Sequence, residues 1–225
     1  MTYGVDRGGH RCEPQNMSAA VPISTPTEHP GALLGGVSLV DGMRVGLRLA
    51  RPSDAPRVRA FLERLSTETR RRRFGTPQPR VSAWLVRHFT FPDPRRRMIV
   101  VATAPLEGTE RIVGMADAAF LRADVAEIAF VVADELQGHG IGHLLAEAAG
   151  ALAARRGAKR LKADIAGGGA AALAVMRGLG PTVSTREDGS TVAYTTVTAP
   201  TTTEGLDEVG PFGSVAELLG GRRAS

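Results

Sequence analysis

The chain has few of the residues that build covalent or metal-linked scaffolds. It has 225 residues and one cysteine, Cys12. A single cysteine excludes an intramolecular disulfide framework and a structural zinc site built on cysteines. Only 4% of the residues are aromatic, but 43% are hydrophobic, so a substantial core can form.

Long apolar segments are also missing. The longest apolar runs are far shorter than the ~20 residues that a membrane-spanning helix requires. No apolar stretch follows a basic start at the N-terminus, so no secretory signal is visible. We therefore expect a soluble, cytoplasmic protein with no membrane partner.

Lysine is nearly absent, although the formal net charge is +5. Of the 28 basic residues, only Lys159 and Lys162 are lysines. The arginine excess accompanies many alanines and glycines, which indicates a partly genomic bias. Basic charge supports nucleic-acid binding only where it clusters on one face, so we do not expect a nucleic-acid partner. The run "RRRR" at 70–73 is typical of a solvated helix face.

The two ends of the chain differ from its middle. Residues 1–42 are rich in Gly, Pro, Ser and Thr and show no lasting period, which indicates a flexible leader. Within it, 31–40 is mildly apolar, but its glycines argue against a stable element. Residues 199–225 indicate a flexible tail with a short amphipathic helix at 214–220.

The middle, residues 43–198, alternates between strand and helix patterns. Ser53 is the cap that we expect for the first helix. The patterns predict a single mixed α/β domain with much antiparallel pairing rather than repeated βαβ units. The expected helices cover 51–65, 67–74, 81–89, 140–156 and 170–179, and the expected strands cover 43–50, 97–104, 111–121, 126–133, 160–166, 182–187 and 191–197.

A glycine-rich stretch, "DELQGHGIGHLL", lies between an expected strand and helix. It lacks the third glycine of a dinucleotide-binding fingerprint, because His143 stands there, and it lacks the lysine of a P-loop. Glycines at a helix start expose backbone N–H groups that favour an anion such as phosphate. The alternative is a turn that only packs helix against sheet. A metal site at His139 and His143 is not expected, because no third ligand is spaced with them.

The pattern Gln137-x-x-Gly140-x-Gly142 resembles motif A of the GNAT superfamily, the Gcn5-related N-acetyltransferases. Two further stretches, "RPSD" at 51–54 and "LSTETRRRRF" at 65–74, resemble the GNAT domain of bacterial protein lysine acetyltransferases. The resemblance covers about 43–198. It implies a GNAT-type, mostly antiparallel sheet of six to seven strands flanked by helices.

The resemblance also implies acetyl-CoA as co-substrate. Its pyrophosphate would meet the loop, and its pantetheine arm would pair with the backbone of the preceding strand where the sheet splays. The implied cofactor-binding residues are Phe130, Val131, Val132, Gln137, Gly138, His139, Gly140, Ile141, Gly142 and His143.

Acyl transfer to an amine requires a base, because an ordinary lysine amine with a pKa near ~10.4 is protonated. Glu127 interrupts an apolar strand and shares a face with Ala129 and Val131. In the related enzymes the matching glutamate is the general base. The alternative for Glu127 is a strand-end carboxylate paired with an arginine. Asp117 and Asp164 are weaker candidates for the base.

Two positions depart from the family pattern. The tyrosine that many members place beside the leaving thiolate is replaced by Met176, so we can name no general acid. The usual asparagine at the next helix start falls in "GGG", Gly167–Gly169, most simply at Gly169. Glycine supplies no side-chain hydrogen bond.

We therefore expect an acetyl-CoA-dependent N-acetyltransferase with Glu127 as general base and a primary amine, most simply a protein lysine, as acceptor. A small-molecule amine is the near alternative. A catalytically weak acyl-CoA-binding regulatory module is the other, motivated by "GGG".

Overall fold

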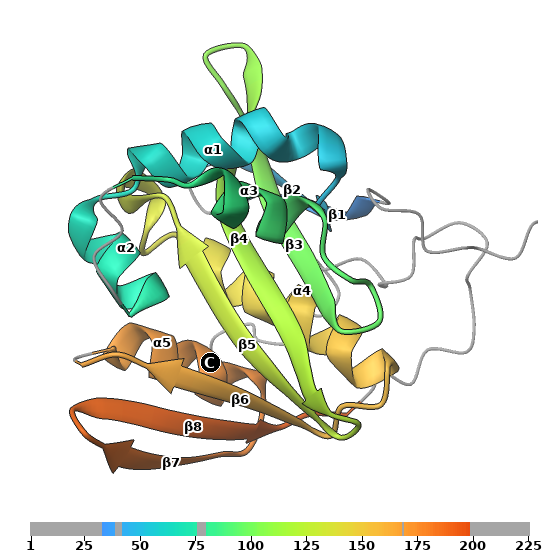
Figure 1. The fold of residues 1–225 in the computed structure, drawn as a ribbon, viewed down its shortest axis with the longest axis vertical. Coiled ribbons are helices and arrows are strands. Elements are labelled where there is room, and N and C mark those ends of the chain that lie inside the picture. The colour runs from blue at the N-terminus through green and yellow to red at the C-terminus, as the bar shows by residue number, and fades with distance from the viewer. Residues whose placement is uncertain (1–32, 39–41, 76–79, 168, 199–225) are drawn as a thin grey trace, which may run out of the picture.

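The computed structural model describes residues 33–38, 42–75, 80–167 and 169–198. They form one eight-stranded sheet in the order β1-β2-β3-β4-β5-β6-β8-β7 (Figure 1). All neighbouring strands pair antiparallel except β5 and β6, which are parallel. The strands are β1 Leu33–Ser38, β2 Arg44–Leu49, β3 Arg97–Leu106, β4 Thr109–Arg122, β5 Val125–Val132, β6 Arg160–Ile165, β7 Thr182–Glu187 and β8 Ser190–Thr196.

Helices cover both faces of this sheet (Figure 1). Residues of α1 Ala55–Arg64 and α3 Ala83–Thr90 pack on one face, together with Val131 of β5. The helices α4 Ile141–Arg155 and α5 Ala170–Leu179 pack on the other face, with Ile128 of β5. Alternate residues of β5 thus serve two cores. The expected mixed α/β, mostly antiparallel architecture is confirmed.

The strand β1 corrects one prediction. Its residues lie inside 31–40, where we expected no stable element, and they pair antiparallel with β2. The reason is that pairing uses main-chain N–H and C=O groups, which glycine possesses like any residue. The strand lies at the end of the sheet order and brings the count above the six or seven expected. The other leader residues, the tail and its expected helix at 214–220 lie outside the described residues.

The "RPSD" stretch builds a buried ion pair. Asp54 is 1% exposed and accepts two hydrogen bonds from Arg48, at 2.6 and 2.8 Å, and one from the N–H of Arg51 at 2.8 Å. Our expectation that Ser53 caps α1 was wrong, because Asp54 stands at the N-cap position and its carboxylate turns back to the preceding strand. The motif therefore joins β2 to α1.

Within the described ranges, no helix is long and apolar enough to cross a membrane. The same ranges hold no group of three or more His, Cys, Asp or Glu side chains placed to hold a metal ion.

Candidate active site

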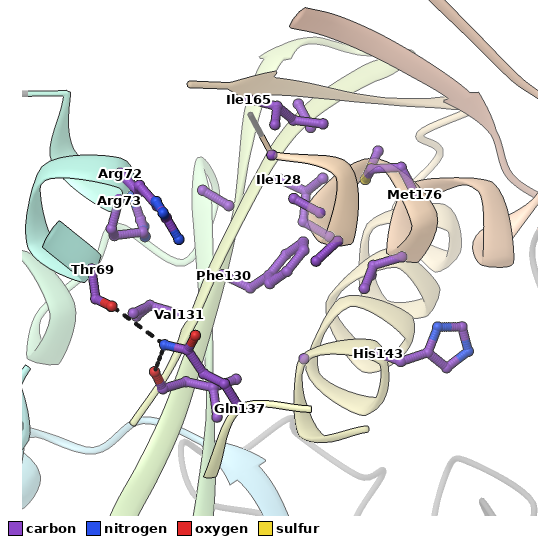
Figure 2. Close-up of a pocket in the computed structure, with 18 of the residues that line it drawn as sticks. Thr69, Arg72, Arg73, Ile128, Phe130, Val131, Gln137, His143, Ile165 and Met176 are labelled. Carbon is purple, nitrogen blue, oxygen red and sulfur yellow. Dashed lines mark hydrogen bonds between the residues drawn. The ribbon is translucent and has the colours of Figure 1, made fainter. Parts of the chain in front are cut away.

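The site begins where the two parallel strands part. The register between β5 and β6 covers three pairs and ends with Glu127 opposite Lys162. A cavity of about 390 Å³ lies between the segments that follow, residues 128–132 of β5 and residues 163–166, which form the end of β6 and the residue after it (Figure 2). This is the splay in the sheet that the resemblance implies.

Two helices form the side walls of this cavity (Figure 2). Thr69, Arg72 and Arg73 line it from α2 Thr67–Phe74, while Val175 and Met176 line it from α5. The cavity falls within the range of roughly 300–1,000 Å³ that small-molecule and cofactor sites occupy.

The backbone of β5 turns alternate edges toward the cavity. The N–H of Ala133, just after β5, donates to the carbonyl of Val113 in β4. Successive residues of an antiparallel strand point their backbone groups to opposite sides. The backbone groups of Val131 therefore also point to β4, whereas those of Phe130 and Val132 point to the splay. Of the three residues expected to pair with pantetheine, two are placed to do so.

The glycine loop places a helix N-terminus at one end of the cavity. Gly138 and Gly140 both have φ +85°, a left-handed conformation that side chains rarely adopt, and α4 begins at the next residue, Ile141. Gly138, Gly140, Gly142 and His143 line the cavity. The positive end of the helix dipole therefore faces it.

Three of the expected cofactor residues are buried or bonded within the protein. Ile141 is 1% exposed and belongs to the core. The imidazole of His139 lies 3.1 Å from the carbonyl of Gln137 and is not part of the cavity lining. The backbone N–H of His143 donates to the carbonyl of Gly140 at 3.0 Å. The amides of the loop that precede His143 are therefore the better candidates for an anion.

Gln137 acts within the protein. Its side-chain N–H₂ donates to the carbonyl of Val132 at 3.2 Å and to the hydroxyl of Thr69 at 3.3 Å (Figure 2). The glutamine of motif A thereby ties the loop to the splayed strand and to α2. The carbonyl of Val132 already accepts this bond. Of the two backbone groups of Val132, the N–H is therefore the better placed to bind a ligand.

Asp134 reinforces this tie. It lies in the 3-10 turn Asp134–Leu136 and accepts hydrogen bonds from the N–H and hydroxyl of Ser66, at 2.8 and 2.7 Å, and from the hydroxyl of Thr69 at 2.6 Å. Burial pushes the pKa of Asp134 upward, but these hydrogen bonds outweigh it and the pKa is lowered. Ser66 also caps α2 by accepting from the N–H of Thr69. Sequence reasoning missed Asp134, although "LSTET" supplies both its partners.

Glu127 lies at the vertex of the splay but outside the cavity lining. Alternation along β5 puts it on the face of Ala129 and Val131, as expected. On the adjacent strand, Lys162 approaches Asp164, with its Nζ 2.9 Å from the Asp164 carboxylate. Hydrogen bonding to Asp164 and the charges of Asp164 and Glu127 raise the pKa of Lys162, against a smaller opposing effect of burial.

The two weaker base candidates separate in the structure. Asp117 is 5% exposed and is bonded by both Arg73 and Arg97. Its carboxylate is therefore committed to joining α2 with β3. Asp164 lines the cavity, and its carboxylate pairs with Lys162. Part of "RRRR" thus has a structural role, while Arg71 and Arg72 pair with Glu68 on the helix surface.

The packing at the start of α5 explains why a glycine stands where the family usually has an asparagine. A Cβ built on Gly169 would lie 2.1 Å from Cγ2 of Ile165, so no side chain fits without movement. The cavity wall here therefore carries no amide group of the kind the resemblance implies. Met176, at the expected tyrosine position, is fully buried and lines the cavity with an apolar side chain.

Comparison with known protein families identifies the family to which this chain belongs. Residues 59–180 match the acetyltransferase (GNAT) family. The chain belongs to the GNAT acetyltransferase family, whose members use acetyl-CoA as co-substrate. The expected family, enzyme class and co-substrate are confirmed.

Solved structures show the same fold. The GNAT domain of S. lividans PAT shares 30% identity, with a TM-score of 0.65 over 72% of this chain and 96% of that one. A cAMP-binding acyltransferase from Mycobacterium smegmatis, mutant R95K, shares 26% identity at a TM-score of 0.51. The alignment covers 82% of this chain but 51% of that one.

A phosphinothricin acetyltransferase from Sinorhizobium meliloti, solved in complex with AcCoA, is 19% identical with a TM-score of 0.55 over 74% of this chain and 96% of that one. At that identity it shows the fold alone. Among curated proteins no match is found.

Proposed function

We propose that this acetyltransferase moves the acetyl group of acetyl-CoA to a primary amine, a protein lysine, with Glu127 as general base. The observation that carries the proposal is that the parted strands β5 and β6 and the glycine turn at the start of α4 line one cavity. The carboxylate of Glu127 stands at the vertex of the splay, next in sequence to the lining residue Ile128.

The cavity suits the parts of acetyl-CoA in order. The loop amides between Gly138 and Gly142 would hold the pyrophosphate, because the helix dipole there favours negative charge. The backbone of Phe130 and Val132 would bond the pantetheine arm along the edge of β5. In that arrangement the thioester would lie back along the strand, toward Glu127. A relative of the same fold holds AcCoA, which supports this ligand.

The chemistry follows from the ordinary pKa values of the reacting groups. A lysine amine, with a pKa near ~10.4, gives up a proton to Glu127, directly or through water. The neutral amine attacks the thioester carbon, so a C–N bond forms and the C–S bond breaks. The second proton of the amine passes to the departing thiolate or to water. The leaving thiol has a pKa of roughly 8.5, so it departs as thiolate with little need of an acid. The apolar Met176 at the tyrosine position is consistent with such a departure.

The protein-lysine acceptor rests on two observations. The motif residues Ser66, Thr69 and Arg73 all make defined contacts, with Asp134 or Asp117, so the resemblance to lysine acetyltransferases extends to working parts of the fold. The S. lividans PAT domain is also matched over 96% of its length at 30% identity.

The test is acetylation of a cell lysate by the purified protein and acetyl-CoA, followed by mass spectrometry of acetylated sites. Calorimetry with acetyl-CoA alone runs beside it. We expect acetyl-CoA binding and new acetyl-lysines in protein. If only small amines were acetylated, the acceptor would be a small amine rather than a protein lysine.

The acyl-CoA-binding module is a second candidate, and the bare wall at Gly169 favours it. Saturable acetyl-CoA binding, combined with no transfer to lysate proteins or to an amine panel, would establish it over the enzyme.

A further inference from the structure

The helix α3 carries large apolar side chains on two faces. Leu85, Val86 and Phe89 are buried in the core that α3 shares with α1 (Figure 1). On the outward side, Trp84 is 70% exposed, and Phe91, directly after the helix, is 51% exposed. A helix needs only one apolar face to pack on a sheet, so packing within the fold does not account for the outer face.

The outward residues Trp84, Arg87, His88 and Phe91 form what we call the α3 stripe. They follow one another at spacings of three or four positions, which places them on one side of the helix. The indole of Trp84 stacks on the imidazole of His88, with ring centroids 5.2 Å apart. The guanidinium of Arg87 lies over the ring of Phe91, 5.0 Å from its centroid. These contacts order the large side chains in advance, so a partner that covers them loses less entropy on binding.

The charge around the α3 stripe is positive. Between Arg80 and Arg97 the chain has arginines at 80, 87, 95, 96 and 97 and a single acid, Asp93. Burial, and then the charge of Arg97, lower the pKa of His88, so its imidazole is uncharged at neutral pH. The stripe thus presents aromatic rings and one arginine in a basic surrounding. Tryptophan and arginine are the residues that most often anchor protein interfaces, and a basic surface complements an acidic partner.

The α3 stripe begins beside the wall of the cavity. Arg73 lines the cavity, and its guanidinium lies 5.7 Å from the ring centroid of Phe89, the neighbour of His88 in α3. Arg73 and Arg97 both pair with Asp117. A polypeptide that crosses α3 can therefore continue to the side of the cavity that α2 forms.

We propose that the α3 stripe binds an acidic segment of the acceptor protein, so that a lysine near this segment reaches the cavity. The inference rests on the proposed function, since it assumes a protein acceptor. Trp84 and Phe91 cover apolar atoms of the segment, and Arg87 pairs with one of its carboxylates. Duplex nucleic acid fits this surface less well, because it is held by rows of phosphate contacts, whereas here one arginine lies between exposed rings.

The experiment compares two lysine peptides that differ only in their flank, which is rich in glutamate in one and in glutamine in the other. We expect the wild-type protein to favour the glutamate peptide in kcat/KM by about tenfold, the effect of one good interface contact. The difference lies in KM, because docking stabilises the bound substrate and the transition state equally. Added salt reduces it. Trp84→Ala and Arg87→Gln each remove most of the preference and leave kcat for the glutamine peptide unchanged.

Exposed residues elsewhere on the protein provide matched controls. Leu121 near the end of β4 is 54% exposed, and Arg186 of β7 is an exposed arginine. Leu121→Ala and Arg186→Gln keep the preference for the glutamate peptide. Thermal unfolding of every variant verifies that it is folded.

The fluorescence of Trp84 tests the surface without any turnover, because Trp84 is the only tryptophan in the chain. A covered indole emits at shorter wavelength and is quenched less by acrylamide. We expect both changes with the glutamate peptide and neither with the glutamine peptide. If Trp84 is protected but no lysine is acetylated, the proposed function fails while acidic docking at α3 is retained. If both peptides are acetylated equally and Trp84 stays exposed, the proposed function holds and the docking surface is overturned.

Other occupants of the α3 stripe would show themselves in the same measurements. Protection of Trp84 by raised protein concentration alone, with dimers in sedimentation, would assign the stripe to a second copy of the chain. Protection by a DNA duplex, and not by the glutamate peptide, would assign it to nucleic acid. Either result would overturn the proposal, as would a Trp84→Ala variant that keeps the full preference for the glutamate peptide.

Discussion

The hydroxyl of Thr69 donates a 2.6 Å hydrogen bond to the carboxylate of Asp134, which joins α2 to the turn that leads into the glycine loop. Gln137 completes the link, because its side chain bonds both Thr69 and the carbonyl of Val132. The loop that lines one end of the cavity is thus fixed by contacts to two separate elements.

The first prediction concerns this link. Asp134→Ala frees the loop from α2, so ordering the loop must then accompany binding, and we expect acetyl-CoA affinity to fall roughly tenfold. Titration calorimetry measures it. Glu135→Ala, the neighbouring exposed carboxylate of the same turn, is the control and keeps wild-type affinity. Equal affinities for both variants would show that the loop holds its shape without Asp134.

The second prediction concerns the buried pair of Arg48 and Asp54, whose side chains are 7% and 1% exposed. Asp54→Ala leaves the exposed Glu110, at the longer distance of 3.4 Å, as the carboxylate that still contacts the buried arginine, and lowers the free energy of unfolding by about 3–5 kcal/mol. Replacing both residues with apolar ones recovers much of that loss. Denaturant unfolding measures the difference. A loss below 1 kcal/mol would show that water reaches Arg48 readily.

The same pair gives the fold an acid-sensitive component. Burial alone would raise the pKa of Asp54, but bonds from Arg48 and the Arg51 N–H lower it below the ordinary 3.8. Because the folded pKa lies below the unfolded value, the stabilisation is fully present above that value. It is lost as pH falls from there through the folded pKa. Wild type should lose more stability over this window than Asp54→Asn does.

The third prediction concerns the glycine that replaces the family's asparagine. Gly169→Asn does not strengthen acetyl-CoA binding, because its Cβ would meet Ile165 at 2.1 Å. We expect overpacking to cost about 1–3 kcal/mol of unfolding free energy. Adding Ile165→Ala makes room and recovers part of it. Tighter acetyl-CoA binding by the single variant, with no loss of stability, would show that the start of α5 adapts.

The order of elements was predictable from local pattern. Alternation at 43–50, and elsewhere short strand-like runs separated by turn residues, marked the seven strands after residue 42. The cavity lies where "AEIAFVV" meets the glycine loop. These features depend on residues that are neighbours along the chain, so they can be predicted from one sequence.

Contacts between distant segments were not predictable in this way. Asp134 bonds Ser66 across 68 positions, and Lys162 lies opposite Glu127 only because β5 and β6 are parallel neighbours. Nothing in the local sequence of either strand specifies that register. The strand β1 was missed for another reason, since its pairing depends on backbone groups rather than on a side-chain pattern.

The roles expected for single residues were refined by backbone direction. The backbone groups of Phe130 and Val132 point to the splayed edge, whereas those of Val131 point to β4. This distinction follows from the hydrogen bond that the N–H of Ala133 donates to Val113, which only the structure shows. Likewise, Gln137 lines the cavity, but its side-chain N–H₂ bonds Val132 and Thr69 within the protein.

The measurement that tests the central claim most directly is single-turnover acetyl transfer by Glu127→Gln at saturating acetyl-CoA. Glutamine keeps the shape of the side chain but cannot accept the proton. The account predicts a transfer rate reduced about 10²–10⁴-fold, with acetyl-CoA affinity within a factor of about two of wild type. A transfer rate equal to that of wild type would contradict it.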